Sequence, residues 1–272
     1  IPYYLNCFNP ALSFAQNIDT LLFSPRAKLG DEFERLFNSI FDNAEGCMKI
    51  VRTLSKRHAG YTREEIAKMS GINPNGDFSK MLKALIGSDF IIQYIPFGLS
   101  KREEHYKLTD CFCWFWIHFK EAMNITEPDY WQHHIKESEI SSWRGLAFEQ
   151  ICLLHIEEIR KKLGISGVLT DVSAFVCRED AEKGIQGSQI DLVIWRADHV
   201  VNLFEMKYTD GLYAITKSLD RDLRRKAGDF RIAAGCRDAV HWVIVTPYGI
   251  ARNAYAGNVQ KEITGEDLFA ET

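Results

Sequence analysis

The 272-residue sequence has no apolar run close to the roughly 20 residues that a membrane-spanning helix needs. Its N-terminus also lacks the basic start and apolar core of a secretory signal. These two absences predict a cytoplasmic protein with no membrane partner. With 46% hydrophobic and 26% charged residues, the composition is that of a soluble globular protein. The length allows two domains, each with its own core.

A phosphate-binding loop is also missing, because no segment matches the pattern G-x-x-x-x-G-K-[ST]. We therefore expect no ATPase activity from this chain. The chain starts at Ile1 without an initiator methionine, so we expect it to be a fragment of a longer protein.

Paired cysteines of the kind that bind zinc are absent as well. The seven cysteines are scattered and odd in number. Cys111 and Cys113 are too close for a C-x₂-C pair, and no second pair follows. This pattern favours buried free thiols.

Excess positive charge is the last feature that the sequence lacks, since its net charge is −4. Residues 1–127 carry 15 basic and 15 acidic residues, and residues 128–272 carry 18 basic and 22 acidic residues. This balance argues against a large polycationic surface of the kind that dominates non-specific nucleic-acid binding. Any contact with DNA must come from local patches.

The first half of the chain reads as a bundle of helices. Apolar residues at helical spacing predict a helix over residues 31–42, and a second apolar set extends to about Lys56. Thr62 to Glu65 then has the form of a capping box, which predicts that a helix starts there. Residues 70–73 form a turn, and a further helix is predicted from about Gly76 to Gly87.

A hairpin follows these two helices directly, with strands at 90–95 and 105–108 around the loop 96–102. Two helices around a turn plus a hairpin predict a winged helix at about 47–108, within a helical domain 1–127. Lys80 and Lys83 on the second helix, and Lys101 and Arg102 on the wing, are candidate DNA contacts. The alternative is a module that only docks proteins or acts as a spacer.

Residues 111–119 are strongly aromatic. We interpret this run as core or as a domain interface, with stacking on nucleic-acid bases as the alternative. The segment Glu127-Pro128-Asp129 is expected to start the connection to a second domain, which spans residues 128–272.

The second domain alternates helices and strands. We predict a long helix over 143–163 that carries Glu149 in a mostly apolar stretch, a strand over 168–177, and a doubly buried strand over 240–246. A short helix is expected at 264–269. The helix predicted over 215–230 is basic, and its candidate phosphate contacts are Lys217, Arg221 and Arg224. The alternative for this helix is an ordinary solvated surface.

The segment 189–207 reads as two apolar strands around the loop 197–199. If the hairpin is centred on Asp198, residues whose numbers sum to 396 face each other, so Asp191 lies opposite Glu205. Period-2 alternation places Lys207 on the face of Glu205, and Gln189 on the face of Asp191.

Two facing carboxylates repel each other, and a divalent cation would offset this repulsion. Hard oxygen ligands suit Mg²⁺ or Mn²⁺. A neighbouring lysine could orient a water or stabilise negative charge on a phosphate. The alternative is a structural ion pair between Lys207 and Glu205 at the end of a sheet.

The order helix, strand, hairpin, basic helix and buried strand resembles the PD-(D/E)XK nuclease superfamily. Asp191 and the triplet Glu205-Met206-Lys207 match its motif, and Glu149 matches the acidic residue that many members carry on the first helix. Ile190 stands where a proline usually precedes the aspartate. The resemblance implies a mixed architecture, in which an all-α/winged-helix domain is followed by an α/β restriction-endonuclease-like domain.

This resemblance also implies roles for the residues. Asp191 and Glu205 would hold Mg²⁺ or Mn²⁺, with the Met206 carbonyl as a further ligand. Lys207 would position the attacking water, and Glu149 would contact the metal through water or bind a second ion. Gln189 is the candidate for positioning the substrate, which is expected to be a nucleic acid, with DNA favoured.

The whole chain, including residues 2–5, 31–37, 62–67, 189–192 and 204–207, resembles the C-terminal half of a bacterial and archaeal AAA-type ATPase family. In that family, a P-loop domain precedes a winged helix and a nuclease-like domain. An ATPase domain is thus an expected partner, and homo-oligomerisation is left open. Two alternatives to a nuclease remain, namely a non-catalytic DNA- or protein-binding regulatory module and a DNA-binding regulator that acts through the winged helix.

Overall fold

The computed structural model describes residues 2–98 and 103–270. The chain divides into two compact units. Unit 1 consists of Ile1–Tyr94 and Glu104–Trp143, and unit 2 consists of Ile95–Glu103 and Arg144–Thr272. Within the described ranges, no helix combines the length and apolar character needed to cross a bilayer.

Unit 1 is mainly helical. Its elements are α1 (Pro2–Leu5), α2 (Phe14–Ile18), the π-helix η1 (Asp19–Phe23), α3 (Glu32–Ile40), α4 (Ala44–Leu54), β1 (Tyr61–Thr62), α5 (Arg63–Ser70), α6 (Gly76–Gly87), β2 (Ile91–Tyr94), β3 (His105–Leu108), α7 (Cys111–Phe115), the π-helix η3 (Trp116–Ala122), α8 (Tyr130–His134) and the start of α9 (Ser138–Leu154). The helices predicted around residues 31–42 and up to Lys56 correspond to α3 and α4. Phe33, Phe37 and Ile50 of these helices are fully buried.

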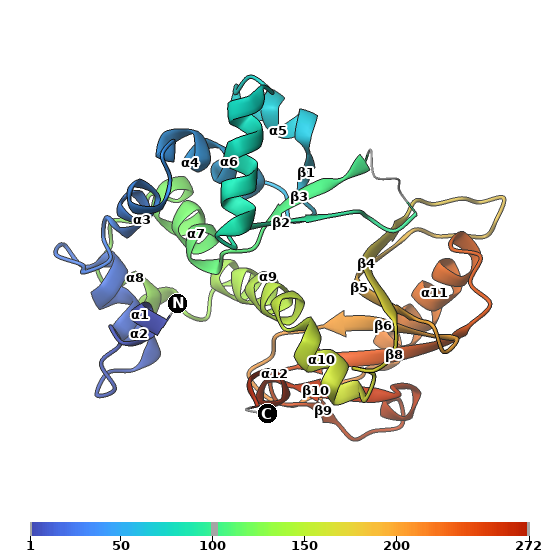
Figure 1. Ribbon diagram of the computed structural model, residues 1–272. Helices are drawn as coiled ribbons and strands as arrows, with labels where there is room; N and C mark the ends of the chain where they lie inside the picture. Colours follow the sequence, from blue (N-terminus) through green and yellow to red (C-terminus); the bar gives the residue numbers. More distant parts are fainter. Residues whose placement is uncertain (1, 99–102, 271–272) are drawn as a thin grey trace. The chain divides into compact units, whose positions relative to one another are not determined.

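Helices α5 and α6 are joined by a short turn and followed by the antiparallel hairpin β2–β3, as predicted (Figure 1). The turn starts at Gly71, whose φ of 71° is a left-handed conformation that glycine adopts without strain. The capping box is confirmed: the Thr62 hydroxyl accepts from the Glu65 amide, and the Glu65 carboxylate accepts from the Thr62 amide at 2.8 Å. β3 also pairs with β1, so the three strands have the order β1-β3-β2.

Replacement of Thr62 by alanine should destabilise unit 1 by about 1 kcal/mol, because one amide at the start of α5 loses its acceptor. Thermal unfolding followed by circular dichroism would measure the change. Thr62→Ser keeps the hydroxyl and should unfold within a few tenths of a kcal/mol of the wild type. An unchanged stability of Thr62→Ala would contradict a role for this cap.

The aromatic segment forms α7 and η3 and is part of the core of unit 1. Phe115, Trp116 and Phe119 are buried, and the Phe119 ring centroid lies 5.1 Å from that of Trp131. Rings that are packed in this way are not available for stacking on bases, so the interpretation as core is confirmed.

All seven cysteines are free thiols, and Cys113 is fully buried.

The boundary between the units falls later than the predicted position at 127/128. Tyr130, Trp131 and Ile140 all belong to the core of unit 1, and unit 1 continues to Trp143. The Asp19 carboxylate accepts hydrogen bonds from the Trp131 amide at 2.8 Å and the Gln132 amide at 3.0 Å. Hydrophobic burial and these backbone contacts hold α8 in unit 1, although Pro128 looks like a linker residue in the sequence.

The loop between β2 and β3 also differs from the prediction, because Ile95–Glu103 belongs to unit 2. The Phe97 amide donates to the Ala174 carbonyl at 3.2 Å. The Phe97 ring is stacked on Trp195, with centroids 5.8 Å apart and planes 8° from parallel, and it also contacts Phe175 and Phe230. This part of the predicted wing is therefore packed in a hydrophobic core.

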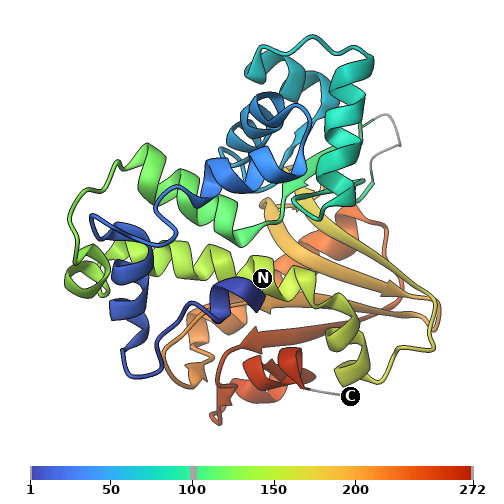
Figure 2. The same cartoon turned by 60° about the vertical axis from the view of Figure 1, so that its left-hand side comes forward.

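Unit 2 is a mixed α/β domain built on a five-stranded sheet of order β10-β8-β6-β5-β4 (Figures 1 and 2). Its elements, after α9, are α10 (Ile156–Leu163), β4 (Thr170–Cys177), β5 (Ser188–Arg196), β6 (Val200–Met206), β7 (Tyr213–Ala214), α11 (Lys217–Ala233), β8 (Ala239–Thr246), β9 (Ile250–Ala251), the 3₁₀ helix η4 (Ala256–Asn258), β10 (Lys261–Thr264) and α12 (Gly265–Phe269). β4, β5 and β6 are antiparallel neighbours, whereas β8 is parallel to both β6 and β10.

Each face of this sheet has its own core. Phe148 and Cys152 of α9 and Ile159 of α10 pack with Phe204 and Val243 on one face. On the other face, Leu223 and Phe230 of α11 pack with Val193, Leu203 and Ile244. Strands with both faces covered are expected to be almost wholly apolar, and β8 has that composition.

The long helix predicted over 143–163 is in fact two helices, α9 and α10, which are separated at His155. His155 has φ −111° and ψ 35°, outside the helical region. Its ring nitrogen Nδ1 lies 2.7 Å from the Ile151 carbonyl oxygen. The apolar periodicity continues through the break, and for this reason it does not reveal the break. α10 ends at Gly164, whose φ is 73°.

Candidate functional site

The hairpin β5–β6 has the predicted loop and register. β5 ends at Arg196 and β6 starts at Val200, which leaves the three-residue loop 197–199. His199 has φ 64°, as expected for the last residue of a three-residue hairpin loop. The paired residues run from Trp195↔Val201 to Leu192↔Phe204, and each pair sums to 396.

A β-bulge interrupts this regularity at Asp191. β4 pairs with β5 at Ser173↔Val193 and again at Phe175↔Ile190, so two residues of β5, Asp191 and Leu192, stand opposite one residue of β4. Ile190 and Val193 both pack in the core on the α11 side, although strict alternation would place them on opposite faces.

The bulge affects the predicted arrangement of the Asp191 and Glu205 carboxylates. The register of β5 with β6 runs as far as Leu192↔Phe204, and the expected opposition of Asp191 and Glu205 lies one position beyond this pair. Period-2 alternation therefore does not by itself place Asp191 relative to Glu205, and their opposition stays a prediction. Bulges redirect side chains and are common beside functional sites.

Glu205 and Lys207 do lie together at the end of β6. Lys207 Nζ is 3.4 Å from Glu205 Oε1, with the lysine side chain 46% exposed and the glutamate side chain 11% exposed. Burial acts to lower the pKa of Lys207, but the Glu205 and Glu149 carboxylates raise it by more, and the net shift is upward. Lys207 is thus a charged group beside the Glu205 carboxylate and under the electrostatic influence of Glu149 on another element.

The other candidate residues are placed as follows. Glu149 lies on α9, half-buried, and contributes to the electrostatic field at Lys207. Gln189 Nε2 donates to Asp191 Oδ1 at 2.8 Å, which confirms that these two side chains share a face. Met206 is the last residue of β6, and its side chain is buried in the core on the α9 side.

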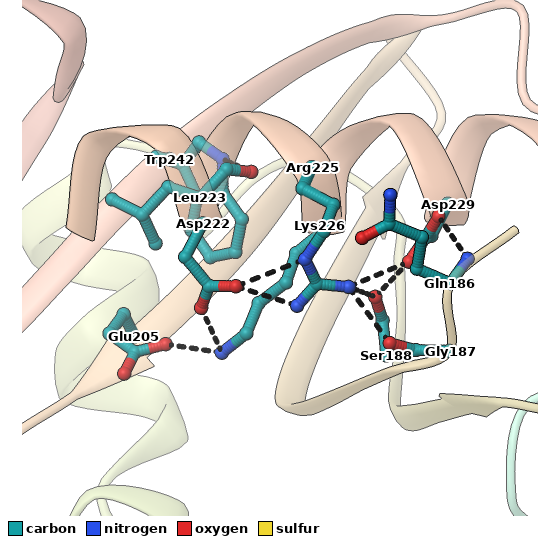
Figure 3. A network of polar contacts seen from close by, with 10 residues as sticks. All are labelled: Gln186, Gly187, Ser188, Glu205, Asp222, Leu223, Arg225, Lys226, Asp229 and Trp242. Carbon is teal, nitrogen blue, oxygen red and sulfur yellow. Dashed lines mark hydrogen bonds and ion pairs between the residues drawn. The ribbon is translucent and has the colours of Figure 1, made fainter. Parts of the chain in front are cut away.

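Lys226 of α11 was not predicted as a site residue. Its Nζ donates to Glu205 Oε2 at 3.0 Å and lies 3.8 Å from Asp222 Oδ2 (Figure 3). The spacing of Asp222 and Lys226 is i, i+4, a signal that the sequence does contain. What the sequence could not show is that this face of α11 meets Glu205.

Beside Lys226, a network of polar contacts joins α11 to the start of β5 (Figure 3). Arg225 Nη1 donates to the Gly187 carbonyl at 2.8 Å and to Asp229 Oδ2 at 3.0 Å. The buried Asp229 carboxylate also accepts from the Ser188 hydroxyl and the Gln186 amide. This network fixes α11 relative to the strand that carries Asp191.

Two further polar residues lie near Lys207 and were also missed. Burial and the Glu205 carboxylate raise the pKa of Tyr213, whereas Lys207 lowers it. Thr246 is fully buried at the end of β8, and its hydroxyl has no hydrogen-bond partner among the described residues. Val245, next to it, accepts a hydrogen bond from the Lys207 amide at 2.9 Å.

The predicted nucleic-acid contacts are only partly described. On α11, Lys217, Arg221 and Arg224 are all exposed, and their spacing places them on one face of the helix. On α6, Lys80 and Lys83 are exposed, with Lys80 Nζ 3.1 Å from Asp77 Oδ1. Lys101 and Arg102 lie outside the described residues.

Whether a divalent cation fits depends on the donors and on their arrangement. The donors, carboxylates on β5 and β6, are the hard oxygens that Mg²⁺ and Mn²⁺ prefer. Their arrangement does not match a preformed site, because both Glu205 oxygens face lysines. Nor does any group of three or more His, Cys, Asp or Glu side chains in the described part of the chain form a metal-binding cluster.

Comparisons with known proteins identify no family. No protein-family model matches the chain, and no curated protein matches it. A crystal structure of a protein of unknown function, AF1548, is similar over 42% of this chain, with 20% sequence identity and a TM-score of 0.28. The matched region spans 58% of that protein. A similarity of this size identifies neither a fold nor a function for this chain.

Proposed function

We propose that unit 2 is a PD-(D/E)XK nuclease-like domain that hydrolyses nucleic-acid phosphodiesters in the presence of Mg²⁺ or Mn²⁺, and that unit 1 contains a winged helix. The observation that carries the proposal is the position of Lys207 at the end of β6, 3.4 Å from Glu205 and in the field of Glu149. An exposed ammonium group near carboxylates from a helix and a strand favours a role in phosphate chemistry over a structural role in a hydrophobic core.

In this proposal, Lys207 meets the phosphate. The pKa of its ammonium group is raised, so the group is protonated at neutral pH and can donate to a phosphate oxygen or to a water. Asp191 and Glu205 are the carboxylates proposed to hold the cation, which would activate the phosphate as a Lewis acid. Hydrolysis adds water across one P–O bond and yields a phosphate monoester and an alcohol.

The test is an assay on the full chain with labelled single-stranded and double-stranded DNA and RNA. Cleavage is expected with Mg²⁺ or Mn²⁺ and not with EDTA. Absence of cleavage of all four substrates with either ion would reject the nuclease proposal.

A non-catalytic binding module is the second candidate, and the paired state of both Glu205 oxygens favours it. A structural site of this kind would bind nucleic acid through the basic face of α11 without cleaving it. The wider resemblance to AAA-type ATPases adds an ATPase domain as a proposed partner of either form.

Both candidates predict that the basic face of α11 contacts phosphates. The double substitution Lys217→Ala with Arg221→Ala should weaken DNA binding at low salt. It should also reduce the slope of log K against log[salt] by about 1.8, if each residue neutralises one phosphate of a duplex. Fluorescence anisotropy at several salt concentrations would measure this slope.

The matched control for this double variant is Lys161→Ala with Lys261→Ala, which removes two exposed lysines from α10 and β10. It should leave the slope unchanged. Equal slopes for the α11 variant and the wild type would rule out phosphate contacts by this face.

A further inference from the structure

The largely buried carboxylate of Glu205 already has two cations. Lys226 Nζ lies 3.0 Å from Oε2, and Lys207 Nζ lies 3.4 Å from Oε1. Each oxygen thus faces one ammonium group, and the glutamate side chain is only 11% exposed. At such a partly buried position these attractions are screened less than on the open surface.

The two lysines are held differently. Lys207 follows the end of β6 and is 46% exposed, whereas Lys226 lies on α11 and is 18% exposed. Asp222 Oδ2 lies 3.8 Å from Lys226 Nζ, and Arg225 binds the same Asp222 side chain through Oδ1 at 2.6 Å. Lys226 therefore reaches Glu205 from a helix whose neighbouring side chains are fixed.

The fixed position follows from the network in Figure 3. Arg225 donates to the Gly187 carbonyl and to Asp229, which anchors this turn of α11 to the start of β5. Because Asp222 accepts from Arg225 on one oxygen and faces Lys226 with the other, the anchoring extends to Lys226. Of the two counter-ions of Glu205, Lys226 is thus held more firmly in place.

We propose that Lys226 is the resident counter-ion of Glu205 and that a divalent cation reaches this carboxylate only by displacing it. The inference rests on the proposed metal-dependent function, since it assigns Glu205 to the cation. An ammonium group and a divalent ion at the same carboxylate repel each other, so Lys226 lowers the affinity for the ion. Carboxylate oxygens are ligands that Mg²⁺ and Mn²⁺ prefer, yet their arrangement here does not match a preformed metal site. Lys226 accounts for this mismatch.

The test is a titration of the full chain with MnCl₂ in the absence of nucleic acid. Isothermal titration calorimetry measures the Kd. Lys226→Met keeps the length of the side chain without its charge. It should lower the Kd for Mn²⁺ by roughly tenfold or more, the order expected for relief of this repulsion even at the dielectric constant of water. Lys226→Gln should act in the same direction and provides the measurement if the methionine variant does not fold.

Two controls locate the effect. Lys161→Met removes an exposed lysine of α10 and should leave the Kd unchanged. Adding Glu205→Gln to Lys226→Met should abolish the gain, because the carboxylate that takes the ion is lost. An unchanged or higher Kd in both Lys226 variants, or a gain that survives Glu205→Gln, would overturn the inference.

The titration also separates this inference from the proposed nuclease activity. Tighter Mn²⁺ binding by Lys226→Met, together with no cleavage of any substrate by the wild-type chain, supports the counter-ion role and rejects the nuclease. A chain that cleaves, but binds Mn²⁺ equally well with and without Lys226, supports the nuclease and rejects the counter-ion role.

Discussion

Lys207→Ala should lose metal-dependent cleavage by a factor on the order of 10² to 10³, the usual effect of removing one group that stabilises charge in a transition state. The lysine is partly exposed and its main ion pair is with Glu205, so the fold should tolerate the change. Single-turnover cleavage of labelled DNA in Mn²⁺ would measure the loss, and circular dichroism would verify the fold.

Lys207→Arg and Lys161→Ala are the matched variants for this experiment. Lys207→Arg keeps the charge but changes its shape, so it should restore only part of the rate. Lys161→Ala, on the exposed surface of α10, should cleave at the wild-type rate. Wild-type cleavage by Lys207→Ala would remove Lys207 from the proposed chemistry and with it the observation that carries the nuclease proposal.

Asp229→Ala should destabilise the chain by about 3 kcal/mol, because Arg225 loses the buried one of its two carboxylate partners and keeps only the more exposed Asp222. The Asp229 side chain is 4% exposed and pairs with Arg225 at 3.0 Å, while Arg225 itself is 30% exposed, so the low end of the usual range applies. The Gln186 amide and the Ser188 hydroxyl would also lose their acceptor. Urea unfolding monitored by tryptophan fluorescence would measure the change.

Asp229→Asn and Asp210→Ala complete this set. The asparagine keeps an acceptor for the Gln186 amide without the charge, and its stability should fall between those of the wild type and Asp229→Ala. Asp210 is 82% exposed, and its removal should change the stability by less than about 0.5 kcal/mol. A change of similar size in Asp210→Ala and Asp229→Ala would show that the network does not stabilise α11.

The hairpin shows how far strand periodicity extends. Apolar alternation and a three-residue loop were enough to predict the pairs from Trp195↔Val201 to Leu192↔Phe204. The prediction stops at Asp191, because the bulge depends on the pairing of β5 with β4. A strand carries no local mark of the register of its second neighbour, so the orientation of Asp191 was not predictable from the hairpin alone.

The basic helix α11 shows which side-chain contacts cannot be predicted from the sequence. Its position was predicted from composition and spacing, and Lys217, Arg221 and Arg224 are exposed as expected of a solvated or phosphate-binding face. Lys226 belongs to a different face, which is directed by the packing of Leu223 and Phe230 against the sheet. Only the tertiary structure brings that face to Glu205.

Unit boundaries depend on packing in the same way. The start of α5 at Thr62 and its end at Gly71 are both determined by local residues, and both can be recognised in the sequence. The assignment of Trp131 to unit 1 follows instead from the buried Asp19 carboxylate more than one hundred residues earlier. Contacts at this separation leave no periodic pattern in the sequence.

The path of the chain limits how the two units can be separated. It passes from unit 1 to unit 2 after Tyr94, returns before Glu104, and passes to unit 2 again after Trp143. A gene fragment that starts at Arg144 would therefore produce unit 2 without Phe97. The rings of Phe175, Trp195 and Phe230 would each lose one aromatic neighbour, and the Ala174 carbonyl would lose its donor. Unit 2 is thus discontinuous in the gene, and excising it by a single cut would produce a protein with an exposed aromatic surface that favours aggregation.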